Sequence, residues 1–177
     1  MPVQIGAEPD SGFDDPLGML TDCHRRIEQF LRILVQVAER ASGRALTGEE
    51  SAAAQLALEY FRTGGRRHNA DEEESLFPRL RAAASEAEFT EITGLESDHR
   101  DAGQWHQAVE SLYATWIERG ALAAPEREEL ISTTRRLKSL YEDHIRLEEQ
   151  AVFPRAAKLL DPKSIAAMGH EFRARRQ

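Results

Sequence analysis

Residues 68–78 read HNADEEESLFP, and residues 144–154 read HIRLEEQAVFP. The two stretches share the pattern H-x-x-x-E-E-x-x-L/V-F-P, and they begin 76 residues apart. On an α-helix, a His and a Glu four residues apart lie about 40° apart in azimuth and about 6 Å apart along the axis, so both side chains reach one cavity. Two such helices supply two imidazoles and two carboxylates. This is a metal-ligand set, and its two carboxylates suit a pair of metals.

The chain around the repeat has the pattern of amphipathic helices. Apolar residues recur with the 3.6-residue period of a helix in four long segments. These segments cover about residues 15–42, 47–80, 88–119 and 124–160. No segment shows the alternation expected of a strand. We therefore expect an all-α fold, an antiparallel up-down four-helix bundle with a short C-terminal fifth helix that could cover one end.

Capping residues and glycines mark the predicted helix ends. Asp15-Pro16 and Asp161-Pro162 combine an N-cap with a proline at the first helical position, and they begin the first and fifth helices. A capping box from Thr47 begins the second helix. Helix stops fall at Gly43 and Gly120. Within the second helix, the pair at 64–65 is expected to loosen the backbone, and the proline at 78 to distort the end.

Composition bounds the class of protein. A length of 177 residues favours one domain, here 15–177 after a flexible N-terminal arm of residues 1–14. The net charge of −8 argues against a sequence-independent nucleic-acid binder, which needs a basic face. One cysteine allows no internal disulfide, and the sequence shows neither a signal peptide nor a membrane span. We therefore expect a cytoplasmic protein.

Histidines and glutamates converge on the predicted bundle axis. Four of the six histidines sit one to each long helix on its apolar stripe: His24, His68, His99 and His144. Glu72 and Glu148 share these inner faces, where unpaired imidazoles and carboxylates are costly to bury. A metal relieves all of these costs, and imidazole with carboxylate but no thiolate suits Fe, Mn or Zn. Two metals bridged by both carboxylates would use the full set.

These residues make the sequence resemble the hemerythrin-like proteins of the HHE cation-binding family, over about residues 15–160. The doubled signature is the specific part of the resemblance, whereas the single histidines of the first and third helices are weak signals alone. The resemblance implies two iron ions with an oxo or hydroxo bridge. It assigns one iron to His24 and His68 and the other to His99 and His144, with Glu72 and Glu148 bridging the pair.

One position departs from the family pattern. Oxygen-carrying hemerythrins have a second His one turn after the third-helix His, where this chain has Gly103. Either one iron lacks a ligand or another group replaces it. His106 lies about 20° from His99 in azimuth but about 10 Å further along the helix, too far for an easy shared iron. An open metal position favours binding of an exogenous ligand or chemistry.

Several other residues have the chemistry or the spacing of a possible metal ligand. Glu28 repeats the His-to-Glu spacing after His24 and is interpreted as a supporting or surface carboxylate. The interpretation of the three tyrosines, at 60, 113 and 141, is aromatic core filling. Glu73, Glu74 and Glu149 are expected to be surface acids. Glu96 precedes the third-helix His in an E-x-x-H spacing, but ferritin-like sites need two such pairs. Cys23 is expected to be inert, and His170 exposed.

The resemblance implies a non-haem di-iron protein that binds O2 or a related small ligand, such as NO or peroxide, for sensing, scavenging or delivery. An enzyme that degrades peroxide or oxidises NO beside His106 is an open alternative. A module for iron–sulfur-centre repair or signalling is another, although the chain lacks an added cysteine-bearing segment. A single structural Zn is the last. No nucleic acid or membrane is expected as a partner, and no protein partner can be named.

Overall fold

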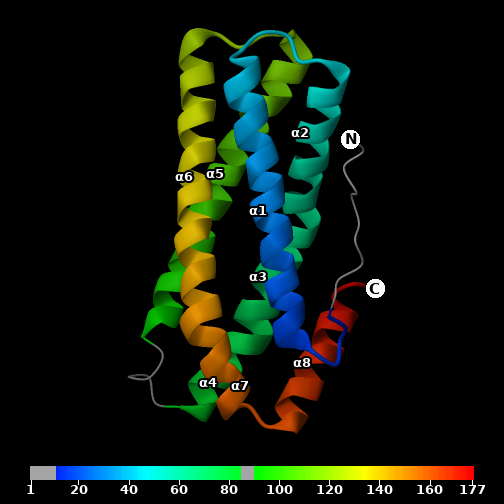
Figure 1. Ribbon diagram of the computed structural model, residues 1–177, viewed down its shortest axis with the longest axis vertical. Helices are drawn as coiled ribbons and strands as arrows, with labels where there is room; N and C mark the ends of the chain where they lie inside the picture. The colour runs from blue at the N-terminus through cyan, green and yellow to red at the C-terminus, as the bar shows by residue number, and fades with distance from the viewer. Residues whose placement is uncertain (1–10, 85–89) are drawn as a thin grey trace.

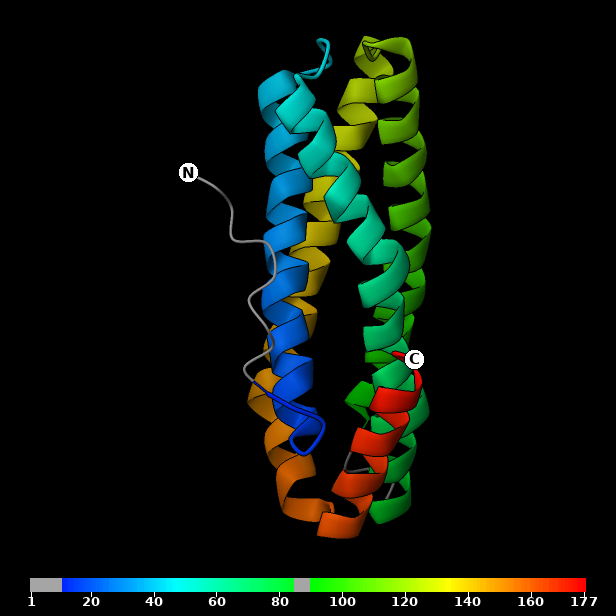
Figure 2. The same ribbon diagram turned by 90° about the vertical axis from the view of Figure 1, so that its right-hand side faces the viewer.

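The computed structural model describes residues 11–84 and 90–177, and the described residues form helices and no strand. Four long helical segments run antiparallel along one axis, and a shorter fifth helix lies beside their lower end (Figures 1 and 2). The prediction of an all-α four-helix bundle with a C-terminal fifth helix is confirmed. No helix in the described ranges combines the length and apolarity that crossing a membrane requires.

The first and third segments are single helices, α1 (Pro16–Ala41) and α5 (Glu91–Arg119). The second and fourth contain π-helical turns, labelled η. The second consists of α2 (Gly48–Tyr60), η1 (Phe61–Gly65), α3 (Arg66–Ala70), η2 (Asp71–Leu76) and α4 (Phe77–Ala83). The fourth consists of α6 (Ala124–Leu147), η4 (Glu148–Val152) and α7 (Phe153–Leu159). The fifth helix is α8 (Pro162–Ala174).

The predicted helix ends form as their sequences indicate. Thr47 and Glu50 make both bonds of the capping box, at 3.1 and 2.9 Å. Asp15 and Asp161 each accept a hydrogen bond from a backbone N–H in the first turn of the helix that follows. Gly120 ends α5 with φ +77°, a conformation that favours glycine. The predicted start of the third helix at 88 lies outside the described residues.

Each copy of the repeat contains a π-helical segment, η2 or η4, directly before its Phe-Pro pair. A proline cannot donate the hydrogen bond to the carbonyl four residues back, and its ring would collide with that carbonyl. A π turn is the wider backbone insertion that accommodates such a defect. The distortion predicted at Pro78 is therefore a π turn, after which the helix continues to Ala83. The predicted loosening at 64–65 is η1.

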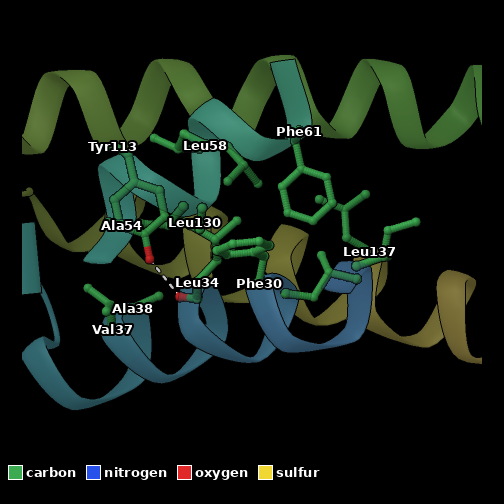
Figure 3. Close-up of a cluster of buried hydrophobic side chains, with 14 of the residues drawn as sticks. Phe30, Leu34, Val37, Ala38, Ala54, Leu58, Phe61, Tyr113, Leu130 and Leu137 are labelled. Carbon is green, nitrogen blue, oxygen red and sulfur yellow. Dashed lines mark hydrogen bonds between the residues drawn. The ribbon is translucent and has the colours of Figure 1, made fainter. Parts of the chain in front are cut away.

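The apolar core is divided into two clusters. The larger one fills the upper half of the bundle, where Phe30, Phe61 and Leu137 face a common centre (Figure 3). The smaller one lies at the lower end, among α4, α7 and α8. On α1, Leu20 belongs to the lower cluster and Ile27 to the upper, so His24 lies between them. The predicted ligand positions thus occupy a polar layer between two apolar ones.

The fifth helix runs along the side of the lower end, against α1 and η2, instead of covering the end. It also holds the described part of the predicted N-terminal arm, residues 11–14. The Arg173 guanidinium of α8 lies 4.8 Å from the centre of the Phe13 ring, whereas the Ser11 N–H is held by α1, where it donates to Asp22 at 2.9 Å. Residues 1–10 lie outside the described residues, and flexibility there stays a prediction.

Gly169 on α8 is expected to be irreplaceable because a Cβ there would lie 1.8 Å from the Phe13 carbonyl oxygen. Helix propensity alone would make Gly→Ala stabilising by about 1 kcal/mol. We expect Gly169→Ala instead to lower the free energy of unfolding by about 2 kcal/mol, as overpacking does. Chemical denaturation measures the change. The matched control is Gly94→Ala, whose Cβ meets no atom within 4 Å and which should stabilise. Equal stability of the two variants would contradict this packing.

Candidate metal centre

The structure brings all six predicted ligand residues together in one buried layer. They come from every long segment: His24 from α1, His68 from α3, Glu72 from η2, His99 from α5, His144 from α6 and Glu148 from η4. Their ligand atoms form two groups, each within 4.8 Å. One contains His24, His68, Glu72 and Glu148, and the other contains Glu72, His99 and His144. Metal ligation by these residues stays a prediction.

Glu72 belongs to both groups, and Glu148 of the first group also lies beside His144 of the second. Glu72 Oε1 lies 3.2 Å from His68 Nε2, and Glu72 Oε2 lies 3.2 Å from His99 Nε2. Glu148 Oε2 lies 3.1 Å from His24 Nε2 and 3.4 Å from His144 Nε2. Each glutamate therefore faces at least one imidazole of each group. That is the placement which the resemblance implied for bridging groups.

Unsatisfied polar atoms test whether cations fit this layer. His24 Nε2, both carboxylate oxygens of Glu72 and both of Glu148 are buried and lack a hydrogen-bond partner among the described residues. The Nε2 atoms of His99 and His144 face each other at 3.2 Å. Each buried atom left unpaired costs about 1–3 kcal/mol, and more when it is charged. Imidazole nitrogens and carboxylate oxygens are ligands for Fe, Mn or Zn, so the residues present fit such ions.

Burial and charge oppose each other at these groups. Burial acts to raise the pKa of Glu72, but the imidazoles of His68, His24 and His99 hold that pKa well below its ordinary value. Burial acts to lower the pKa of His24, but the close carboxylates of Glu148, Glu149 and Glu72 raise it well above its ordinary value. The same balance raises the pKa of His99 to about 9. The carboxylates therefore require positive charge beside them, and a cation can replace protons in supplying it.

Comparison with known proteins agrees with this geometry. The model of the hemerythrin HHE cation-binding domain matches residues 15–156. The chain belongs to the hemerythrin HHE cation-binding family. It is also similar to an uncharacterized protein of Haemophilus influenzae, with 29% identity over 174 residues that cover 93% of this chain and 92% of the relative. Binding of a cation by this hemerythrin-like chain is thus supported by its family as well as by its ligand groups.

Three carboxylates contact the imidazoles of this hemerythrin-like centre from outside, and the sequence did not predict these contacts. Glu73 and Glu149 have side chains 40% and 38% exposed, as predicted, yet each reaches inward. The Nδ1 atom of His99 lies 2.7 Å from Glu73, and that of His24 lies 2.9 Å from Glu149. Asp98 lies 3.2 Å from the Nδ1 atom of His144. Such contacts orient a metal-binding imidazole and increase its basicity.

The second glutamate of the Glu-Glu pair in each copy of the repeat is the sequence feature that could have predicted the contacts of Glu73 and Glu149. In each copy the first Glu points into the centre, and the second contacts a histidine on a different long segment. Glu73 in η2 contacts α5, and Glu149 in η4 contacts α1. His68 differs, because its Nδ1 atom has no partner among the described residues and burial lowers its pKa to about 4.

Neutralising Glu73 or Glu149 should weaken metal binding without removing a ligand. We expect Glu149→Gln and Glu73→Gln each to lower metal affinity by about 10–100-fold, the usual effect of losing such an outer carboxylate. Competition with a chelator of known affinity measures this change. Glu118→Gln, at an exposed position near the far end of α5, controls for loss of one negative charge. Equal affinities for all three variants would show that the outer contacts are incidental.

The alternative ligands are placed away from the six. Glu28 is exposed on α1. The Tyr60 hydroxyl donates to the Cys23 carbonyl, and the Tyr113 hydroxyl donates to the Leu34 carbonyl, so both tyrosines serve the core. Burial raises the pKa of the Cys23 thiol, which keeps that thiol protonated. Glu96 pairs with Arg81 at 2.8 Å, and His170 is exposed.

His106 and Tyr141 form a pair beside the centre. His106 Nε2 lies 3.2 Å from the Tyr141 hydroxyl, and the His106 ring lies 4.2 Å from that of Phe61. Burial lowers the pKa of His106 to about 4. Burial, together with Glu72 and Glu148, raises the pKa of Tyr141. His106 is therefore a partly buried residue that pairs with Tyr141, and it lies outside both groups of ligand atoms.

The C-terminal helix holds the segment that carries Glu72. Asp71, the residue before it, is fully buried and contacts Arg175 at 2.9 Å and Arg176 at 2.6 Å. Arg175 also donates to Ser75 Oγ at 2.9 Å. Both arginines are themselves largely covered. The basic end of the chain thus fixes the backbone of η2, a role that its sequence did not suggest.

Removing both arginines should destabilise the protein, because it leaves a buried carboxylate without its partners. We expect Arg175→Ala with Arg176→Ala to cost about 3 kcal/mol of unfolding free energy. Asp71→Asn should lower the unfolding free energy by less, because it removes the buried charge, whereas the arginine variant leaves that charge without a partner. Urea denaturation compares the variants. Lys158→Ala with Lys163→Ala removes two exposed cations and serves as the control. A larger loss for Asp71→Asn than for the arginine pair would refute this account.

Proposed function

We propose that this hemerythrin-like protein holds two iron ions with an oxo or hydroxo bridge and binds O2 or a related small ligand, such as NO or peroxide. The residues that would hold the irons are His24 and His68 on one side and His99 and His144 on the other, with Glu72 and Glu148 between them. The observation that carries the proposal is the sharing of both glutamates between the two imidazole groups.

The number of carboxylates supports two cations over one. Two glutamates lie inside the layer, and Glu73, Glu149 and Asp98 contact its imidazoles from outside. Two ferrous or ferric ions bring a positive charge of similar size to these five carboxylates. A single divalent ion would balance only two of the five negative charges, and the rest would depend on protonated imidazoles and on the partial exposure of the outer three carboxylates.

The chain's own residues would orient and protect the ions. Iron supplies a reversible redox change and an exchangeable coordination position, which ligand binding requires. The outer carboxylates hold three imidazoles in fixed orientations. The apolar clusters above and below the layer exclude water, and this strengthens each electrostatic contact inside it. Sensing, scavenging and delivery of the small ligand are the uses consistent with such a centre.

Metal analysis tests the proposal. Protein reconstituted with ferrous iron under argon and then exposed to air should contain two irons per chain and show the absorption of an oxo-bridged diferric pair. Glu148→Ala should lose this absorption and at least one iron, because it removes a shared ligand, while Glu118→Gln should keep both. Helicity measured by circular dichroism separates iron loss from unfolding. A wild-type stoichiometry of zero or one, or a single tightly held zinc, would overturn the proposal.

A further inference from the structure

A cavity of about 220 Å³ lies between the second and third helical segments, and it is linked to the metal centre by Tyr141, whose ring packs against that of His144. One wall is formed by η1 and α3, the opposite wall by α5, and the inner end by Tyr141 of α6. The residues on which the following argument depends are Gly65, Arg62, Gly103, His106, Glu110 and Tyr141. The cavity is therefore polar at both ends, with a glycine in each of its two facing walls.

Gly103 leaves the cavity open. It is exposed on α5, and a Cβ built there would meet no atom within 4 Å. It lies one helical turn, about 6 Å along the axis, beyond His99. A side chain at position 103 would therefore lie close to the imidazole of His99. In this chain that volume is free space, and it connects to the surface.

Tyr141 lies between the inner end of the cavity and the His99 and His144 group. Its ring packs edge-on against that of His144, with centroids 6.3 Å apart and an interplanar angle of 68°. The Tyr141 hydroxyl lies 3.2 Å from His106 Nε2, and both residues line the cavity. Gly103 and Tyr141 thus neighbour the His99 and His144 group, whereas His24 lies on the other side of the shared glutamates.

The polar groups of the cavity indicate what it accepts. At the mouth, Arg62 is paired with Glu110 at 2.8 Å, and the exposed Arg66 adds a positive charge beside them. At the inner end, His106 is neutral in its buried site and keeps one ring N–H. When that N–H lies on Nε2 and donates to Tyr141, the phenol O–H is free to donate to a guest. A small ligand with a hydrogen-bond-accepting atom matches this end.

We propose that this cavity is the access route and the seat of the small ligand, that the ligand binds on the His99 and His144 side in the space left by Gly103, and that Tyr141 donates a hydrogen bond to it. His106 acts as a positioning residue that orients the phenol. The ligand class is a small oxygen- or nitrogen-containing acceptor such as peroxide, and azide is the probe. The inference rests on the proposed function, because the ligand needs a metal beside the cavity.

Filling the cavity from Gly103 tests the route. Azide is titrated into the reconstituted diferric protein, and its dissociation constant is read from the absorption change. We expect Gly103→Leu to raise that constant by at least about tenfold, since groups of even methylene size alter binding in a close-fitting pocket by about 10–200-fold. Gly94→Leu, on the same helix and equally open at its Cβ, should leave the constant unchanged. Iron content should be equal in both variants.

Removing the phenol O–H tests the hydrogen bond. Tyr141→Phe keeps the ring against His144 and should weaken azide binding by about tenfold, the effect of losing one hydrogen bond to a charged acceptor. Tyr113→Phe loses a hydroxyl bonded to the Leu34 carbonyl in the upper core, so it should bind azide as the wild type does. Should Gly103→Leu fail to fold, Gly103→Ala with azide and the bulkier thiocyanate gives the same comparison.

The outcomes separate this inference from the proposed function. Wild-type protein without two irons overturns both. Wild-type protein that holds two irons and binds azide, while Gly103→Leu and Tyr141→Phe bind it as well as their controls do, overturns only the cavity assignment. Weakened azide binding in both variants at full iron content supports the assignment.

Discussion

The structure depends on the burial of two carboxylates among four imidazoles. Glu72 and Glu148 are fully covered, and each lies between histidines of two different groups. In an apolar interior such charges require compensation within a few ångströms. The four long segments are arranged so that each contributes an imidazole to this layer, and the apolar clusters pack above and below it. A set of side chains compatible with cation binding thus lies in the middle of the core, and its assembly requires the four segments to pack in one register.

The sequence repeat has two functions within this arrangement. Its His and first Glu belong to the six predicted ligands, and its second Glu contacts a histidine on another long segment. Its Phe-Pro pair follows a π turn, and the phenylalanines enter the lower apolar cluster. The ring of Phe77 is stacked against that of His99, and the ring of Phe153 against that of His24. Each copy therefore contributes residues to the polar layer and to the lower apolar cluster next to it.

Periodicity and capping residues were sufficient to predict the bundle, the fifth helix and most helix ends, because these features depend on neighbours close in the chain. The six inner residues were predictable for the same reason, since their phase on each helix places them on the axis. The contact of Glu149 with His24 was not, because it spans 125 residues and depends on how two helices are rotated against each other. The position of α8 also depended on a distant contact, between Asp71 and the arginines. The partial exposure of Glu73 and Glu149 was predicted correctly, but exposure does not reveal that their carboxylates contact His99 and His24.

The contacts of Asp71 with Arg175 and Arg176 also bear on the order in which the centre is assembled. Arg175 follows Asp71 by 104 residues, so during translation the turn bearing Glu72 emerges long before the groups that fix it. Contacts between such distant parts of a chain form late, after local helices are in place. Until then Asp71 has neither arginine beside it, and the neighbouring glutamate is held only by its own helix. If the centre holds the proposed ions, their insertion is expected only after Arg175 and Arg176 have been synthesised and have fixed the turn that carries Glu72.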